Sequence, residues 1–273
     1  MQGPFINRET FKQRLKQLFA PVLVFLAAAW SKIALIIKVG LPLLKMGGSL
    51  LVTLVIYGKL FGWRWAAGVL LLIFIHEMGH LIAARMVGLD VSLPLFIPFF
   101  GAAILLREMP RNAWIEAIIG IGGPILGSLG ALAVTACYFY TGNNIFLALG
   151  YTGCLINLFN LIPIIPLDGG RIVSAVSPWL WIIGICILIP YLAYRALTGS
   201  VMALVFGVVV LFIVYTNSHR IVALFRGNSP AQARYFECTP LQRWSMGILY
   251  LGLAVSLFFG MTYIHHLLPP GMI

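Results

Sequence analysis

Three residues that can bind or activate a metal ion occur within five positions, in the segment His76-Glu77-Met78-Gly79-His80. Apolar residues surround this segment on both sides, so it lies in a stretch that could span a membrane. Ionisable side chains are costly in hydrocarbon, and a bound metal ion can compensate for their lost hydration. On an α-helix, residues i and i+4 share one face, so His76 and His80 can direct their imidazoles at one ion. Glu77 lies about 100° from His76 around the helix, where it can act on a water molecule without binding the metal.

A third metal ligand is expected from the segment 160–171, which reads NLIPIIPLDGGR. A catalytic zinc site usually has three protein ligands and keeps its fourth position for water. The prolines break a helix and the paired glycines free the backbone, so the Asp168 carboxylate can approach a metal from a distorted helix end. His219 lies in a polar linker, and His265 and His266 lie beside the C-terminal prolines, which makes these three poorer candidates. The expected cofactor is therefore one Zn²⁺ ion per chain.

The composition is that of a protein with several membrane-spanning segments. Of its 273 residues, 61% are hydrophobic and only 9% are charged, whereas soluble domains contain about 25% charged residues. The net charge of +11 comes from basic residues in short linkers and at the N-terminus, which is the pattern of cytoplasmic loops. We therefore expect contact with membrane lipids and no binding of nucleic acid. The four cysteines are far apart and form no C-x-x-C pair, which predicts small core residues.

Only seven acidic residues occur in the chain, so the surroundings of each one are informative. Glu77 and Asp168 stand in apolar or Gly/Pro-rich segments, where a carboxylate needs a functional partner. The other five lie near Arg, Pro or Asn at the expected ends of spans, and we predict that they are solvated at the membrane interface. These are Glu9, Asp90, Glu108, Glu116 and Glu237.

Seven apolar segments are candidates for helices within the membrane. They are 47–61, 65–87, 113–139, 145–166, 178–197, 200–216 and 243–264. Segment 5–19 combines an apolar face with basic residues on its other faces, which predicts an amphipathic helix at the membrane surface. Lysines interrupt the end of segment 20–45, so the sequence leaves it open between a tilted helix and a hairpin in the interface.

Basic residues predict the orientation of the chain in the membrane. Arginines follow the segments 65–87 and 145–166, and the linker 217–241 is basic as well, so these parts are expected on the cytoplasmic side. The three candidate metal ligands would then lie toward the cytoplasmic half of the bilayer. The basic residues concerned are Arg85, Arg107, Arg111 and Arg171, with His219, Arg220, Arg226 and Arg234 in the linker.

The segment 91–106 is apolar, but its two prolines and Gly101 argue against a continuous helix. An extended hairpin that dips into the membrane fits better, and it should be shielded by protein because free strand edges are costly in lipid. A strand edge at this place could pair with the backbone of an unfolded substrate. A purely structural re-entrant loop is an equally good interpretation.

Together these features predict an all-α polytopic membrane protein. Residues 1–64 would form the amphipathic helix and the first membrane segments. Residues 65–176 would carry the candidate metal ligands and the membrane-associated hairpin or re-entrant loop near 91–106. Flanking transmembrane helices would follow in 177–273.

The order and spacing of two motifs resemble the site-2 protease family, the intramembrane zinc metalloproteases of peptidase family M50. HEMGH is followed about ninety residues later by N-x-x-P-x-x-P-L-D-G-G. The resemblance covers residues 65–176 and implies that they form a three-helix catalytic core. It further implies that His76, His80 and Asp168 bind zinc and that Glu77 is the general base. It also implies that Asn160, with Pro163 of the same motif, lies near the site and contacts the substrate or a developing oxyanion. Alternatively, Asn160 is a helix-breaking residue whose side chain bonds to the backbone.

The middle core helix departs from the family pattern at one position. Members often have Gly-Pro-x-x-Asn in this helix, and Gly127 stands here in place of the Asn. A side-chain hydrogen bond at this point is therefore in doubt. Close helix packing through the small residues Gly123, Gly127 and Gly130 is the expected role.

The predicted function is that of an intramembrane zinc endopeptidase, which cleaves membrane-protein or peptide substrates within or near their transmembrane segments. Two other functions share some of these sequence features. A metal transporter also carries His and Glu within membrane helices, but transporters often show paired repeats, and the sequence contains one cluster only. A catalytically silent scaffold would not need all of the expected catalytic residues. The substrate and the oligomeric state stay open.

Overall fold

The computed structural model describes residues 38, 40–99, 101–199, 201–226 and 229–269. The predicted surface helix 5–19 and most of the segment 20–45 lie outside these residues. The chain divides into two units, Met1–Gly48 and Ser49–Ile273. In the first unit the described residues are helical. The second unit contains the candidate site and is described by itself below.

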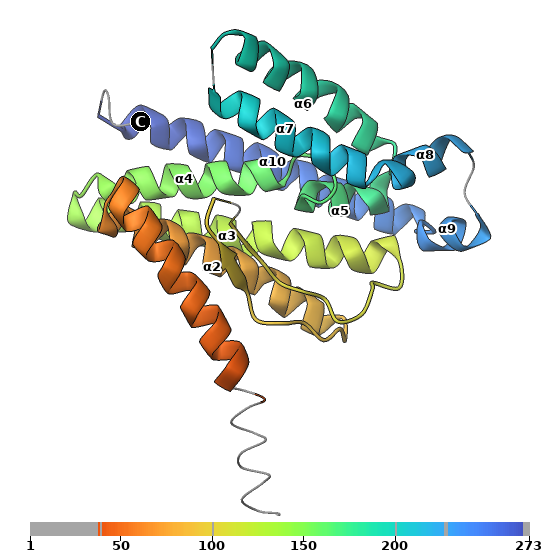
Figure 1. The fold of residues 1–273 in the computed structure, drawn as a ribbon, viewed down its shortest axis with the longest axis horizontal. Helices are drawn as coiled ribbons and strands as arrows, with labels where there is room; N and C mark the ends of the chain where they lie inside the picture. Colours follow the sequence, from red (N-terminus) through yellow and green to blue (C-terminus); the bar gives the residue numbers. More distant parts are fainter. Residues whose placement is uncertain (1–37, 39, 100, 200, 227–228, 270–273) are drawn as a thin grey trace, which may run out of the picture. The chain divides into compact units, whose positions relative to one another are not determined.

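Long apolar helices dominate the described residues (Figure 1). Five of these helices are long enough to span a membrane: Gly40–Phe61, α2 Trp63–Met86, α3 Ala113–Thr141, α6 Leu180–Leu197 and α10 Pro240–Leu267. The shorter helices are α4 Ile145–Asn160, α5 Asp168–Val176, α7 Val201–Thr216, α8 Ser218–Arg226 and α9 Pro230–Tyr235. The prediction of an all-α polytopic membrane protein is thereby confirmed, and this is a multi-pass membrane protein.

Helix α3 is the centre of the core, because α2, α4 and α5 all pack against it. Helix α10 covers α4 and α5, and α6 pairs with α7 (Figure 1). Where α2 crosses α3, a Cβ atom on Gly79 would lie 2.2 Å from the carbonyl oxygen of Gly122. Only glycine permits this approach, so the backbones of α2 and α3 are in direct contact. The contact brings the two histidines of α2 against α3.

Helix α4 is shorter than predicted, since it ends at Asn160 and not near position 166. Proline has no backbone N–H and clashes with the preceding turn, so Pro163 and Pro166 cannot continue the helix. The carbonyl oxygen of Leu161 accepts a hydrogen bond of 2.6 Å from the hydroxyl of Tyr250 in α10. The chain then turns through residues 161–167 and enters α5 at Asp168. The basic linker 217–241 contains the two short helices α8 and α9.

The predicted hairpin near 91–106 is confirmed. Strand β1, Leu95–Ile97, pairs antiparallel with β2, Gly101–Ala103, and a further bridge joins Val91 to Leu106. Phe96 is 3% exposed and stacks on Phe74 of α2. Its N–H donates to the Ser49 hydroxyl, and the N–H of Phe99 in the turn donates to the Tyr57 hydroxyl. Two polar side chains of the helix Gly40–Phe61 therefore already occupy the N–H groups on this side of the hairpin.

Candidate metal centre

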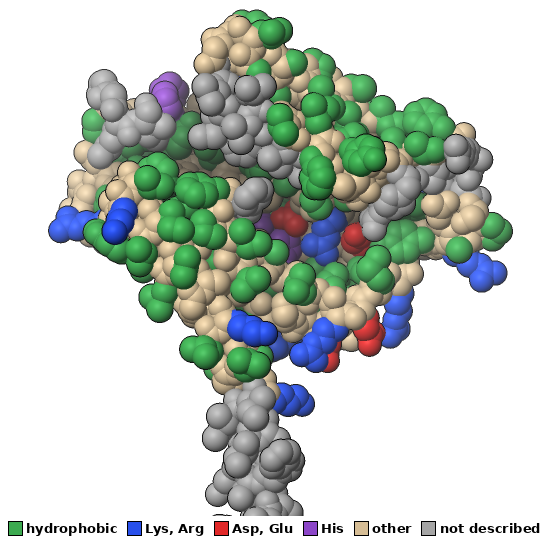
Figure 2. All heavy atoms as spheres, viewed as in Figure 1, with side chains coloured by type: hydrophobic (Ala, Val, Ile, Leu, Met, Phe, Trp, Pro, Cys, Tyr) green, Lys and Arg blue, Asp and Glu red, His purple; other side chains and the backbone are tan. Residues whose placement is uncertain are grey.

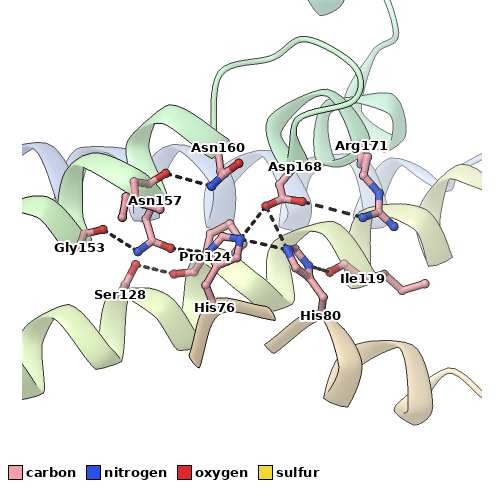
Figure 3. Close-up of polar contacts among 11 residues, drawn as sticks. His76, His80, Ile119, Pro124, Ser128, Gly153, Asn157, Asn160, Asp168 and Arg171 are labelled. Carbon is pink, nitrogen blue, oxygen red and sulfur yellow. Dashed lines mark hydrogen bonds and ion pairs between the residues drawn. The ribbon is translucent and has the colours of Figure 1, made fainter. Parts of the chain in front are cut away.

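His76, His80 and Asp168 meet at one point between α2 and α5 (Figure 3). The Nε2 atoms of both histidines lie 3.1 Å from Oδ2 of Asp168 and 3.1 Å from each other. All three residues are buried, with exposed fractions of 3%, 4% and 7%. They form the single group of three or more His, Cys, Asp or Glu side chains suited to a metal within the described part of the chain.

Hydrogen bonds on the far side of each imidazole determine which nitrogen faces this point. Nδ1 of His80 lies 2.7 Å from the carbonyl oxygen of Ile119, and Nδ1 of His76 lies 2.9 Å from Oδ1 of Asn157. These oxygens can only accept, so both Nδ1 atoms must carry the hydrogen. A histidine that binds a metal is neutral, and in the neutral rings both Nε2 atoms direct lone pairs at each other and at the Asp168 carboxylate. Three converging lone pairs repel one another without a cation, and two nitrogens with one carboxylate oxygen are a donor set that zinc accepts. The residues present therefore fit a zinc ion.

Close packing of the chain before α5 places Asp168 in the centre. A Cβ atom on Gly169 would lie 2.1 Å from the carbonyl oxygen of Leu161. Gly170 accepts a hydrogen bond of 2.7 Å from Nε1 of Trp181 at its carbonyl oxygen. Asp168 thus starts a new helix and does not extend from a distorted helix end as predicted. The two glycines are helical, so they provide room for close contact and not unusual backbone conformations.

A chain of polar contacts links Asp168 to α3 and α9. Nη1 of Arg171 lies 3.9 Å from Oδ1 of Asp168, and its Nε lies 3.9 Å from Oε1 of Glu116. The other oxygen of Glu116 accepts a hydrogen bond from the hydroxyl of Tyr235 at the end of α9. The Glu116 side chain is only 14% exposed. The prediction of a solvated interfacial carboxylate is therefore wrong for this residue, because Arg171 and Tyr235 replace its water.

The remaining candidate residues lie around this centre without bonding to the three ligands in the described contacts. Glu77 follows His76 on α2 and is 7% exposed. Asn160 is half-buried, and its amide donates a hydrogen bond of 3.1 Å to the carbonyl oxygen of Ile156. Pro163 packs against Gly184 of α6. A contact of Asn160 or Pro163 with substrate stays a prediction.

Sequence reasoning did not identify Asn157, which bonds directly to His76. The available signal was a polar residue in the apolar segment 145–160, three positions before Asn160. The glycines of α3 explain how these side chains fit. A Cβ atom on Gly123 would lie 2.2 Å from Nε2 of His80, and one on Gly127 would lie 2.4 Å from Oδ1 of Asn157. The small residues of α3 thus accommodate the site as well as the neighbouring helices.

The surface around the metal centre is more polar than the rest of the molecular face on which it lies. Figure 2 shows histidine, acidic and basic side chains next to one another in a recess at the middle of a face that is otherwise largely apolar. A polar recess in such a face gives water a place within a membrane protein. The arrangement can therefore bring a metal ion, a carboxylate and water together.

The chain is similar to known metalloproteases in part of its length. The model of peptidase family M50 matches residues 65–146, which include HEMGH and the whole of α3. A zinc metalloprotease of Methanocaldococcus jannaschii is 35% identical over 120 residues, which cover 41% of this chain and 34% of the relative. The protein Rip3 of Mycobacterium tuberculosis is 33% identical over 138 residues, or 46% of this chain and 34% of the relative. The matches thus span about a third of the length of these curated relatives.

Proposed function

We propose that this chain, which belongs to peptidase family M50, the family of site-2 proteases, is an intramembrane zinc endopeptidase. It would hydrolyse peptide bonds within or near the transmembrane segments of membrane-protein substrates. The observation that carries the proposal is the buried set of His76, His80 and Asp168, with Glu77 beside it on a helix long enough to span a membrane. Such a concentration of ionisable groups at membrane depth is costly unless it serves chemistry.

In this proposal His76, His80 and Asp168 hold one zinc ion. The ion, when bound, polarises a peptide carbonyl and makes water more acidic. The Glu77 carboxylate accepts a proton from the water that attacks the carbonyl carbon. As the carbon–nitrogen bond breaks, Glu77 passes this proton to the departing amine nitrogen. The products are a new carboxyl end and a new amine end, and Glu77 returns to its ionised form.

A substrate helix must unwind locally before it can react, because its carbonyl groups are bonded to N–H groups four residues on. Gly, Pro or polar residues in the substrate span would favour this step. We propose that the hairpin holds the unwound stretch by strand addition. The free edge would be β2, since Ser49 and Tyr57 already bind the N–H groups of Phe96 and Phe99.

Removal of zinc should abolish cleavage. The full chain would be purified in detergent, reconstituted into liposomes with a model membrane-spanning peptide that contains a Gly-Pro pair, and assayed by mass spectrometry of the products. We expect cleavage within or near the span, loss of at least about 100-fold in rate on chelation, and recovery when zinc is added back. A peptide with an all-Leu span should be cleaved more slowly. Cleavage at an unchanged rate by protein shown to contain no metal would contradict the proposal.

We further propose that the metal centre faces the cytoplasmic half of the bilayer. The centre lies near the end of α2 and the start of α3, and arginines gather at this end of the core. The opposite end, where Gly68 packs against Leu149 near the start of α4, is close to the loop 142–144. An excess of arginine favours the cytoplasmic side. The described arginines near the centre include Arg85, Arg107, Arg111, Arg171 and Arg243.

Cysteine labelling in intact cells tests this orientation. Glu108 and Asn143 are exposed and belong to the connections at the two opposite ends of α3, so each is replaced by Cys in a separate variant. A membrane-impermeant maleimide should label Asn143→Cys in intact cells. It should label Glu108→Cys only after the membrane has been permeabilised. The reverse labelling pattern would show that the centre faces the opposite side.

The native cysteines determine the background for this labelling. Cys137 and Cys186 are exposed and are first replaced by Ser, whereas Cys154 is buried and can stay. Burial raises the pKa of the half-buried Cys238 thiol, although the charge of Arg243 acts in the opposite direction. The thiol is therefore mostly protonated at neutral pH and reacts slowly. The protein that carries these two Ser substitutions and no introduced cysteine should accordingly show little labelling.

A further inference from the structure

Asn157 is a buried amide that has no place in the mechanism described above. It lies on α4 with 2% of its surface exposed. Its Nδ2 donates a hydrogen bond of 2.7 Å to the carbonyl oxygen of Gly153, one turn earlier in the same helix. That bond turns Oδ1 toward His76, whose Nδ1 lies 2.9 Å away (Figure 3). Both polar ends of the amide are therefore used, and the orientation of the group is defined.

Helix α3 provides the space for this amide at Gly127. A Cβ atom at Gly127 would lie 2.4 Å from Oδ1 and 2.9 Å from Nδ2 of Asn157. Any side chain at this position would collide with the amide or displace it. The amide also occupies the space that a side chain extending from position 127 would enter. An amide could therefore reach His76 from either helix, and in this chain it comes from α4.

The two ligand histidines differ in what orients them. His80 donates its Nδ1 hydrogen to the carbonyl oxygen of Ile119, which belongs to the backbone of α3 and cannot be removed by substitution. His76 depends on the Asn157 side chain for the same purpose. A ring whose outer nitrogen loses its acceptor can rotate or change tautomer, and the Nε2 lone pair is then no longer fixed toward the metal.

We propose that Asn157 is a positioning residue, which fixes the ring orientation and tautomer of His76 for the metal, and that Gly127 is required to admit its amide. The inference rests on the proposed zinc site but not on proteolysis, because its consequence is a change in metal affinity. Groups that orient a ligand histidine from outside typically contribute 10–100-fold to metal affinity.

Substitution of Asn157 by Leu removes the acceptor and keeps the same number and branching of side-chain heavy atoms. We expect zinc affinity to fall by about 10–100-fold, measured by competition with a chromophoric chelator on the purified full chain. The Co²⁺ absorption spectrum should change in band position or intensity, since it reports the geometry of the ligands. Asn157→Asp keeps an acceptor for the Nδ1 hydrogen and should retain zinc affinity. Unchanged zinc affinity and an unchanged Co²⁺ spectrum in Asn157→Leu would overturn the proposal.

A more demanding test moves the amide from position 157 on α4 to position 127 on α3. Gly127→Asn alone should lower zinc affinity, because the new side chain collides with the Asn157 amide. The double variant Gly127→Asn with Asn157→Ala removes this collision and offers His76 an amide from α3. Zinc affinity should then be higher in the double variant than in Asn157→Ala alone. If zinc affinity were lower in the double variant than in Asn157→Ala alone, this would contradict the requirement for an amide beside His76.

Thr135→Val is the matched structural control. Thr135 is buried between α3 and α4, donates its hydroxyl to the Ala131 carbonyl oxygen, and lies 2.1 Å from where a Cβ atom on Gly150 would be. It thus makes the same kind of contact as Asn157 but touches no ligand. Its substitution should leave zinc affinity unchanged, and an equal loss would show that helix packing alone causes the effect. Zinc binding without proteolysis in the wild type would contradict only the proposed function, whereas a folded wild type without zinc or Co²⁺ binding would overturn both.

Discussion

Glu77→Gln is expected to reduce peptide hydrolysis by at least about 100-fold, because removal of a general base typically costs 10²–10⁴-fold in rate. The amide that replaces the carboxylate has nearly the same shape but cannot accept the proton of the attacking water. Zinc content should stay at the wild-type value, since His76, His80 and Asp168 are unchanged and Glu77 forms no described bond to them. The rate would be measured on the reconstituted model substrate, and zinc by mass spectrometry of the same preparation.

This variant also separates the proposed protease from other membrane proteins that bind metals. A transporter or a scaffold would show no hydrolysis for the substitution to remove. Glu108→Gln is the matched control, because Glu108 is an exposed carboxylate outside the centre and its neutralisation should leave the rate unchanged. Wild-type hydrolysis by Glu77→Gln would mean that another group moves the proton.

Local rules were sufficient to predict that His76 and His80 share one face of a helix and that the segment 91–106 forms a hairpin. The spacing of His76 and His80 requires only that the segment be helical, and α2 is helical throughout. The segment 91–106 is identified by residues that cannot continue a helix, because proline and glycine act on the backbone next to them. Predictions of this kind depend on a few neighbouring residues, so they do not require knowledge of the packing.

Features that depend on contacts between distant segments were missed. Asn157 in the sequence is one polar residue in an apolar segment, and nothing nearby indicates that it faces a histidine 81 positions earlier. The residues around Glu116 predict a solvated carboxylate, because its partner Tyr235 lies 119 positions later in the chain. For these two residues the packing of distant helices decides the outcome. The predicted end of α4 is too late for a local reason, because an average of hydropathy does not register that Pro163 lacks an N–H group.

Asp168→Ala should reduce zinc binding more than any other single substitution considered, and proteolysis should be lost with it. Oδ2 of Asp168 is the only oxygen within 3.1 Å of both Nε2 atoms in the described contacts, so its removal leaves two nitrogen ligands. Removal of a metal ligand should lower zinc affinity by more than about 100-fold, which is the largest effect typical of a group that only orients a ligand. Zinc content measured by mass spectrometry should therefore fall from near one ion per chain to a small fraction.

The fold should tolerate this substitution, so the loss of zinc can be assigned to the ligand. Alanine is a good residue for the first turn of a helix, and Arg171 keeps its second partner, Glu116. Asp90→Ala is the control, because its carboxylate is 83% exposed and pairs only at 3.9 Å with Arg107. Zinc retained at the wild-type level in Asp168→Ala would show that a different group is the third ligand. Glu77 would then be the first residue to test, since a carboxylate that binds the metal could not also serve as the free base in the proposed reaction.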